Sequence, residues 1–132
     1  TMENHLRADL IAWLRDDPAL LAINTIEEES PLRASPPWLG ISASTSTDWS
    51  TKDRSGREIR IALELETRTD APAADADLVA AIEARGLDLP TSPQNSEVAS
   101  LRILRARSEQ RAKNRRGALI EFRFRLFHSI AE

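Results

Sequence analysis

The sequence predicts an α+β fold, in which a four-stranded, mostly antiparallel sheet carries two helices packed on one face. Two observations support this prediction. Apolar residues recur at helical spacing near residues 3–17 and 70–86, and they alternate with polar residues in other segments that are typical of strands. The order α-β-β-α-β-β places successive strands close enough to pair as two hairpins, with the helices covering one face. At 132 residues, the chain is expected to form a single domain over residues 1–132.

The first helix is predicted from an amphipathic segment with Asn4 as its expected N-cap. Pro18 should end this helix near Asp16 or Asp17, because the residue before a proline is biased away from helical backbone. The acidic and proline-rich residues 24–37 are predicted to be a loop. The apolar stripe of the helix consists of Leu6, Leu10, Trp13 and Leu14.

Two strands follow in the predicted order. Residues 38–44 are rich in β-branched and small residues, and the polar connection 44–56 contains a single aromatic residue, Trp49. Residues 57–67 give the clearest strand pattern, because apolar and charged residues alternate with a period of two. The inward residues of this strand are predicted to be Ile59, Ile61, Leu63 and Leu65.

The second helix is predicted over residues 70–86, with Asp70 as N-cap and Gly86 at the C′ position. Asp75 and Asp77 lie near its positive end. Its predicted apolar stripe is Ala74, Leu78, Ala81 and Ile82. Residues 98–107 form a third strand with less regular alternation. The last strand spans residues 118–129, with Ile120, Phe122, Phe124 and Leu126 facing the core.

One short stretch is strongly basic, although the whole chain has a net charge of −3. Residues 105–116 hold six of the eighteen basic residues and one acid, which leaves twelve basic and twenty acidic residues elsewhere, a net charge of −8. This balance excludes a generally basic nucleic-acid-binding protein. Three interpretations of the stretch stay open: a solvated hairpin tip, a contact to an acidic partner, or the wall of a channel through which DNA passes.

No pattern in the chain indicates catalysis or metal binding, so we predict a protein that is no enzyme and has no cofactor. There is no cysteine, which excludes disulfides, thiolate zinc sites and cysteine nucleophiles. The two histidines, His5 and His128, lie near opposite ends of the chain, and neither belongs to a metal-binding spacing. The glycines are isolated, and no apolar run has the length of a membrane span or of a leader peptide. An intracellular protein, or one assembled inside a cell, is expected.

Several segments occur in the order seen in a widespread family of phage proteins. They are LRADLIAWLRDDPAL, DWSTKDRSGREIRIALELETR, ADLVAAIEARGLDL, and VASLRILRAR with RRGALIEFRFRL. Over residues 3–130 the chain resembles the small tail-completion or tail-terminator-like proteins of siphophages, prophages and gene transfer agents. The most specific part is Asp48–Trp49 followed by Thr51 and Lys52 before a long strand. The acidic IEEES at residues 26–30 has no counterpart in the resemblance.

The resemblance implies a structural role in virion assembly, without catalysis or cofactor. Such proteins are similar to terminators that form a ring, often hexameric, on the head-proximal end of a tail tube, stop its growth and offer a surface to the head connector. The implied partners are other copies of the chain, the tail tube protein and the connector protein, with DNA only passing through the lumen. The implied location is the bacterial cytoplasm during assembly and then the particle tail. The alternatives are a neck protein on the connector and a monomeric nucleic-acid-binding module that uses residues 105–116.

Under this interpretation the connections 44–56 and 108–117 reach toward the tube or the connector, because long loops in compact domains tend to be functional. Trp49 docks either on its own fold or on a partner. The charged outer face of the sheet is either solvated or in contact with a second copy. The predicted contact residues are Asp48, Trp49, Lys52, Arg54, Arg111, Lys113, Arg115 and Arg116 in the connections, with Glu64, Glu66, Arg123 and Arg125 on the sheet.

Overall fold

The structure of the protein, a computed structural model, describes residues 1–31, 33–68, 72–90, 96–112 and 114–128. The α+β class is confirmed, but the sheet has five strands in the order β1-β2-β3-β5-β4, where four were predicted. The elements along the chain are α1 (Met2–Arg15), the 3₁₀ helix η1 (Pro18–Leu20), β1 (Thr25–Glu27), β2 (Trp38–Asp48), β3 (Gly56–Thr67), α2 (Pro72–Leu87), β4 (Ser96–Gln110) and β5 (Arg116–His128).

The additional strand, β1, lies in the segment that was predicted to be a loop. It runs parallel to β2, from Thr25 opposite Trp38 to Glu27 opposite Gly40. Three residues are too few to show an alternating pattern, and the pairing depends on contact with a distant segment. The other neighbours pair antiparallel, with β2–β3 and β4–β5 as the two predicted hairpins and β3–β5 joining them.

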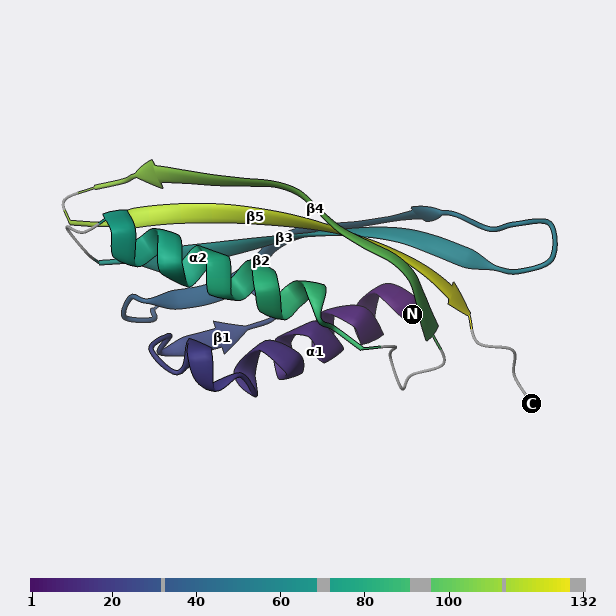
Figure 1. The fold of residues 1–132 in the computed structure, drawn as a ribbon, viewed down its shortest axis with the longest axis horizontal. Coiled ribbons are helices and arrows are strands. Elements are labelled where there is room, and N and C mark those ends of the chain that lie inside the picture. Colours follow the sequence, from purple (N-terminus) through teal and green to yellow (C-terminus); the bar gives the residue numbers. More distant parts are fainter. Residues whose placement is uncertain (32, 69–71, 91–95, 113, 129–132) are drawn as a thin grey trace.

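Both helices cover the same face of the sheet (Figure 1). The opposite face, called the open face below, carries the charged side chains that alternate with the core residues. The predicted inward rows of β3 and β5 are confirmed, since all their members are at most 1% exposed: Ile59, Ile61, Leu63, Leu65, Ile120, Phe122, Phe124 and Leu126.

Helix α1 agrees with its predicted stripe, but its start differs from the prediction. Leu6, Leu10 and Leu14 are buried, and Trp13 packs partly against the core. The N-cap is Thr1, whose hydroxyl accepts from the Asn4 amide at 3.2 Å, so the prediction of Asn4 as N-cap was wrong. The helix ends at Arg15, as Pro18 predicted.

Helix α2 is rotated relative to the prediction. Its buried residues are Asp75, Val79, Ile82 and Gly86, whereas Ala74 is exposed. Gly86 lies inside the helix and not at the predicted C′ position. A Cβ at this residue would lie 2.5 Å from the Phe122 ring. The glycine therefore allows close approach between helix and sheet. The predicted N-cap, Asp70, lies outside the described residues.

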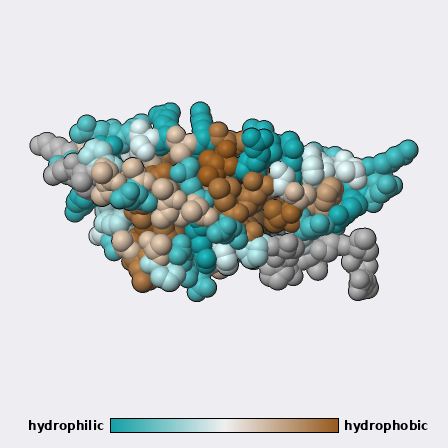
Figure 2. Space-filling model, viewed as in Figure 1, coloured by the Kyte–Doolittle hydropathy of each residue, from teal (hydrophilic) through white to brown (hydrophobic). Residues whose placement is uncertain are grey.

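The strands are longer and the connections shorter than predicted, so the hairpin tips comprise residues 49–55 and 111–115. The two tips lie at opposite ends of the elongated molecule (Figure 1). The projecting end that carries residues 49–55 is hydrophilic, while hydrophobic residues gather over the middle (Figure 2). Register shifts in β4 between Val98 and Ser100, and between Ile103 and Arg105, explain its irregular alternation.

Candidate assembly surfaces

Arg111, at the 111–115 tip, folds back onto the open face. Its Nη1 lies 2.8 Å from Glu64 Oε2 and 3.5 Å from Glu66 Oε1, and its Nε lies 3.7 Å from Glu109 Oε1. Its guanidinium occupies the space above Gly117 that any Cβ would fill. Burial acts to lower the pKa of Arg111, but the hydrogen bond to Glu64 and the charges of Glu64, Glu66 and Glu109 outweigh burial and raise it. The sequence-predicted Arg111, Glu64 and Glu66 therefore form one cluster.

The basic stretch is compensated by acids of the same chain. Besides Arg111, every described basic residue of 105–116 has an acidic partner, so the stretch presents no uniform positive field. The pairs are Arg105–Glu121 at 2.9 Å, Arg107–Glu109 at 3.1 Å, Arg115–Glu66 at 3.6 Å and Arg116–Asp75 at 2.7 Å. Lys113 lies outside the described residues. This arrangement speaks against the channel-wall interpretation, because the cations are already paired.

Arg116 belongs to the helix side of the sheet and not to the open face. Its Nε donates to Asp75 Oδ2 at 2.7 Å, and the other carboxylate oxygen of Asp75 accepts from the Thr67 hydroxyl at 2.8 Å. Asp75 and Thr67 are both buried. The pair thus ties β5 to the first turn of α2 and to the end of β3, so Arg116 supports the fold.

Trp49, at the 49–55 tip, docks on its own sheet. Its ring centroid lies 4.8 Å from that of Phe127, and the Arg125 guanidinium lies 5.4 Å from the Trp49 centroid. The Arg54 guanidinium lies 4.3 Å from the Phe127 ring centroid and pairs with the Glu97 carboxylate at 2.8 Å. These contacts hold the tip against the end of β5. An assembly role for Trp49 and Arg54 stays a prediction.

The outermost part of this tip is polar and exposed. Asp48 accepts from the Ser50 hydroxyl at 2.7 Å, and the Thr51 amide donates to the Arg54 carbonyl at 2.8 Å, which closes the turn. Lys52 is exposed and has no ion-pair partner in the described part of the chain. Among the predicted contact residues at this end, Lys52 presents its charge most freely to a partner.

The charged residues of the open face lie opposite one another in two ways, acid opposite base and base opposite base. Glu58 lies opposite Arg125, and the two side chains pair at 3.0 Å. The hydrogen bond from Arg125 is the main cause that lowers the pKa of Glu58. Arg123, however, lies opposite Arg60 and not opposite an acid. Glu64 and Glu66 therefore lie with Arg111 at one end of the face, Arg125 lies toward the other end, and Arg123 lies between them.

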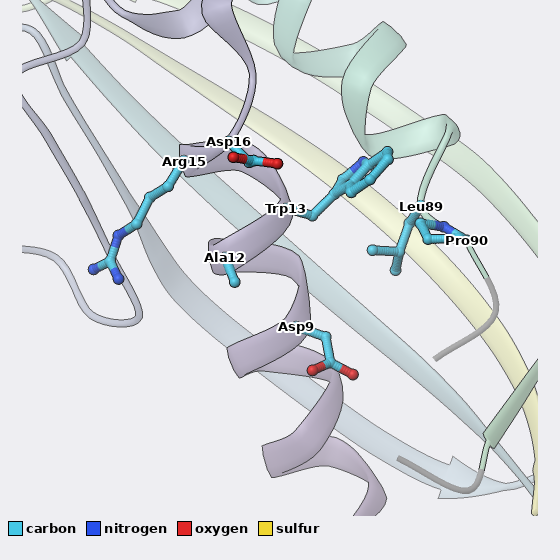
Figure 3. Close-up of a pocket in the computed structure, with 7 residues that line it drawn as sticks. All are labelled: Asp9, Ala12, Trp13, Arg15, Asp16, Leu89 and Pro90. Carbon is cyan, nitrogen blue, oxygen red and sulfur yellow. The ribbon is translucent and has the colours of Figure 1, made fainter. Parts of the chain in front are cut away.

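A groove of about 550 Å³ lies on the helix side, between α1 and the segment that follows α2 (Figure 3). The Trp13 indole N–H donates to the Arg85 carbonyl at 2.8 Å, and the Arg85 guanidinium lies 3.4 Å from the Trp13 ring centroid. These contacts lock α1 to α2. The groove is lined by Asp9, Ala12, Trp13, Arg15, Asp16, Leu89 and Pro90. Among the described residues, no histidine and no side-chain hydroxyl lines it.

Within the described ranges, no three histidine, aspartate or glutamate side chains come together as a possible metal site. In the same ranges, no helix has the length and apolar character needed to cross a membrane.

The comparisons with known proteins agree with the fold. The family model described as "Tail completion protein gp17" matches residues 8–128. The chain belongs to this family. The match confirms the resemblance found in the sequence. A search of curated proteins finds no match. A chain from a solved structure, "Virion of native gene transfer agent (GTA) particle", is similar in fold, with a TM-score of 0.72, 20% identity, and coverage of 92% of this chain and 94% of that chain.

In this member of the tail completion family, the matched residues include both hairpin tips and the open face. Sequence reasoning missed the acidic partners Asp75 and Glu121, which compensate Arg116 and Arg105. No local signal marks such pairs, because they join residues whose proximity depends on strand register and helix rotation.

Proposed function

We propose that this chain is a non-enzymatic assembly protein of a phage-like tail. Copies of the chain form a ring at the head-proximal end of the tail tube, six-membered as the resemblance implies. The ring ends tube growth and offers a joining surface to the head connector, while DNA only passes through its lumen. Assembly takes place in the bacterial cytoplasm, and the finished ring stays in the particle.

The observation that carries this proposal is the family match over residues 8–128. The fold likeness to a chain of a gene transfer agent virion supports it over 92% of this chain. Two features of the structure are compatible with the role. The hairpin tips lie at opposite ends of the molecule, so one subunit has a separate surface for each neighbour along the tail (Figure 1). The arginines of residues 105–116 are paired with acids, so they would not bind passing DNA tightly.

The test is deletion of the gene from a phage or gene transfer agent that encodes this chain, followed by electron microscopy. Unattached heads and tails without a terminal ring are expected, and the intact gene restores joined particles. Normal joined particles after deletion would contradict the proposal. Antibody labelling then separates two positions: label on headless tails supports the tail ring, whereas label on tailless heads assigns the chain to the neck.

A charge-matched pair of variants tests the 49–55 tip. Lys52→Glu is expected to reduce the fraction of joined particles, because Lys52 is exposed at the end of a projecting hairpin. Arg33→Glu, a reversal at an exposed residue outside both tips, serves as the control. Equal assembly by both variants would remove Lys52 from the joining surface.

A further inference from the structure

Three arginines lie side by side across the middle of the open face. Arg60 of β3 is opposite Arg123 of β5, which is opposite Arg102 of β4. Residues directly opposite one another in neighbouring strands have side chains on the same face, and the strands are about 4.8 Å apart. This arginine row therefore spans about 10 Å.

The arginine row is poorly compensated within the chain. Arg60 shares Glu58 with Arg125, at 3.4 Å against 3.0 Å. Among the described residues, Arg123 donates to the Ser100 hydroxyl at 3.5 Å, and its buried Nε has no hydrogen-bond partner. The charge of Arg123 also helps to lower the pKa of Glu58, an acid that Arg60 and Arg125 already share. Arg102 is exposed and has no acidic partner among the residues that the structure describes. Like charges directly opposite one another destabilise a sheet, so the row weakens the isolated fold.

A second, oppositely charged surface lies at the β1 edge of the sheet. Glu28 and Glu29, called the acidic segment below, are exposed and have no ion-pair partner in the described ranges. Their backbone is held in place, because the Glu28 carbonyl accepts from Arg7 at 3.1 Å and the Glu29 carbonyl would lie 2.9 Å from a Cβ at Gly40. The acidic segment thus has a held backbone that presents two exposed carboxylates.

We propose that the arginine row of one copy binds the acidic segment of another copy. The proposal rests on the ring proposed above and names a contact between its neighbouring subunits. Within one chain the two surfaces stay apart, since Gly40 pairs with Glu64, which is about 13 Å along β3 from Arg60. The contact joins two different surfaces, and repetition of such a contact forms a ring when its rotation closes.

Carboxylates fit the row better than a nucleic-acid strand does. Glu58 and Glu121 lie on the strands of the row, within two residues of Arg60 and Arg123. A phosphate chain that crossed the face would pass these acids, whereas a compact pair of carboxylates meets only the guanidiniums. On the open face, Trp49 and Phe127 lie together at the 49–55 tip, and Trp38 lies opposite Glu66 and donates to its carboxylate at 3.1 Å. These rings offer no stacking platform between the arginines.

Cross-linking tests the contact even when association is weak. The chain has no cysteine, so single cysteines can be placed at will. A Glu29→Cys chain is mixed with an Arg102→Cys chain and treated with a short bismaleimide. The mixed dimer is expected in several-fold higher yield than from Asp53→Cys with Arg102→Cys, a control at an exposed residue of the hairpin tip. Equal yields would overturn the proposal.

Charge exchange provides the second test, read by concentration-dependent light scattering and by cross-linking. Arg60→Glu/Arg102→Glu and Glu28→Arg/Glu29→Arg are each expected to lose association about tenfold or more, and mixing the two variants restores it. The first variant should also melt a few degrees higher than wild type, because Arg123 gains opposite acids. Unchanged association, or no recovery on mixing, overturns the contact.

Two further outcomes would show that the arginine row does not bind the acidic segment. Row variants that lose affinity for a short DNA duplex but associate like wild type would assign the row to nucleic acid and overturn the proposal. Row variants that associate normally and still restore joined particles would refute this contact while leaving the ring proposal intact. Failure of the ring proposal itself has a separate sign, the normal assembly of particles after gene deletion.

Discussion

Replacing Arg116 by alanine is expected to destabilise the fold, whereas the same change at Arg115 is expected to have little effect. The two arginines are consecutive, but their surroundings differ. Arg116 Nε lies 2.7 Å from Asp75 Oδ2, with side chains 22% and 11% exposed. Arg115 lies 3.6 Å from its nearest acid oxygen, on Glu66, and its side chain is 45% exposed. Arg115→Ala is therefore a matched control.

The loss of stability in Arg116→Ala depends on how well the remaining Asp75 carboxylate is stabilised. A hydrogen bond to a charged group contributes about 1.5–3 kcal/mol, and removing one partner of a fully buried ion pair costs about 3–5 kcal/mol. Water reaches part of the Arg116 side chain, and the Thr67 hydroxyl and the N-terminus of α2 still stabilise the Asp75 carboxylate. The free energy of unfolding should therefore fall by about 2 kcal/mol. For Arg115→Ala the loss should stay below about 0.5 kcal/mol.

Urea unfolding followed by tryptophan fluorescence measures both variants. With a slope of about 2 kcal/mol per molar urea, Arg116→Ala should shift the midpoint down by about 1 M. The Arg115→Ala midpoint should match wild type. Equal midpoints for Arg116→Ala and wild type would refute the assignment of Arg116 to the fold, and equal losses in both variants would refute the distinction between them.

Three further changes test the packing and the electrostatics. Gly86→Ala should lower the free energy of unfolding by about 1–3 kcal/mol, because the new methyl meets the Phe122 ring; a melting temperature at or above wild type would contradict this. Trp49→Ala should lower it by about 1–2 kcal/mol through lost contacts with Phe127 and Arg125; unchanged thermal stability with lost assembly would favour docking on a partner. Glu58→Gln should lower the free energy of unfolding at neutral pH only. The lowered pKa of Glu58 means that its stabilisation is complete above its ordinary value of 4.5 and disappears as the pH falls through the lowered value, so thermal unfolding of variant and wild type should converge in acid.

The sequence by itself determined the helices, the inward rows of β3 and β5, and the family resemblance. Each of these depends on neighbouring residues. Ile59 to Leu65 alternate within one strand, and Leu6, Leu10 and Leu14 recur within one helix, so the buried side of each element can be read without knowing what packs against it. The order of such elements along the chain also carried the family resemblance.

The tertiary structure alone decided the pairing of β1, the rotation of α2 and the ion pairs of the basic stretch. The parallel pairing of β1 needs a distant partner strand. Helix α2 turns Asp75 inward because Thr67 and Arg116 bind it there. The arginines of residues 105–116 look free in the sequence but meet acids of other strands and of α2. The arginine row likewise exists only through register, because which charges lie opposite one another is set by the packing of the whole sheet and not by any local period.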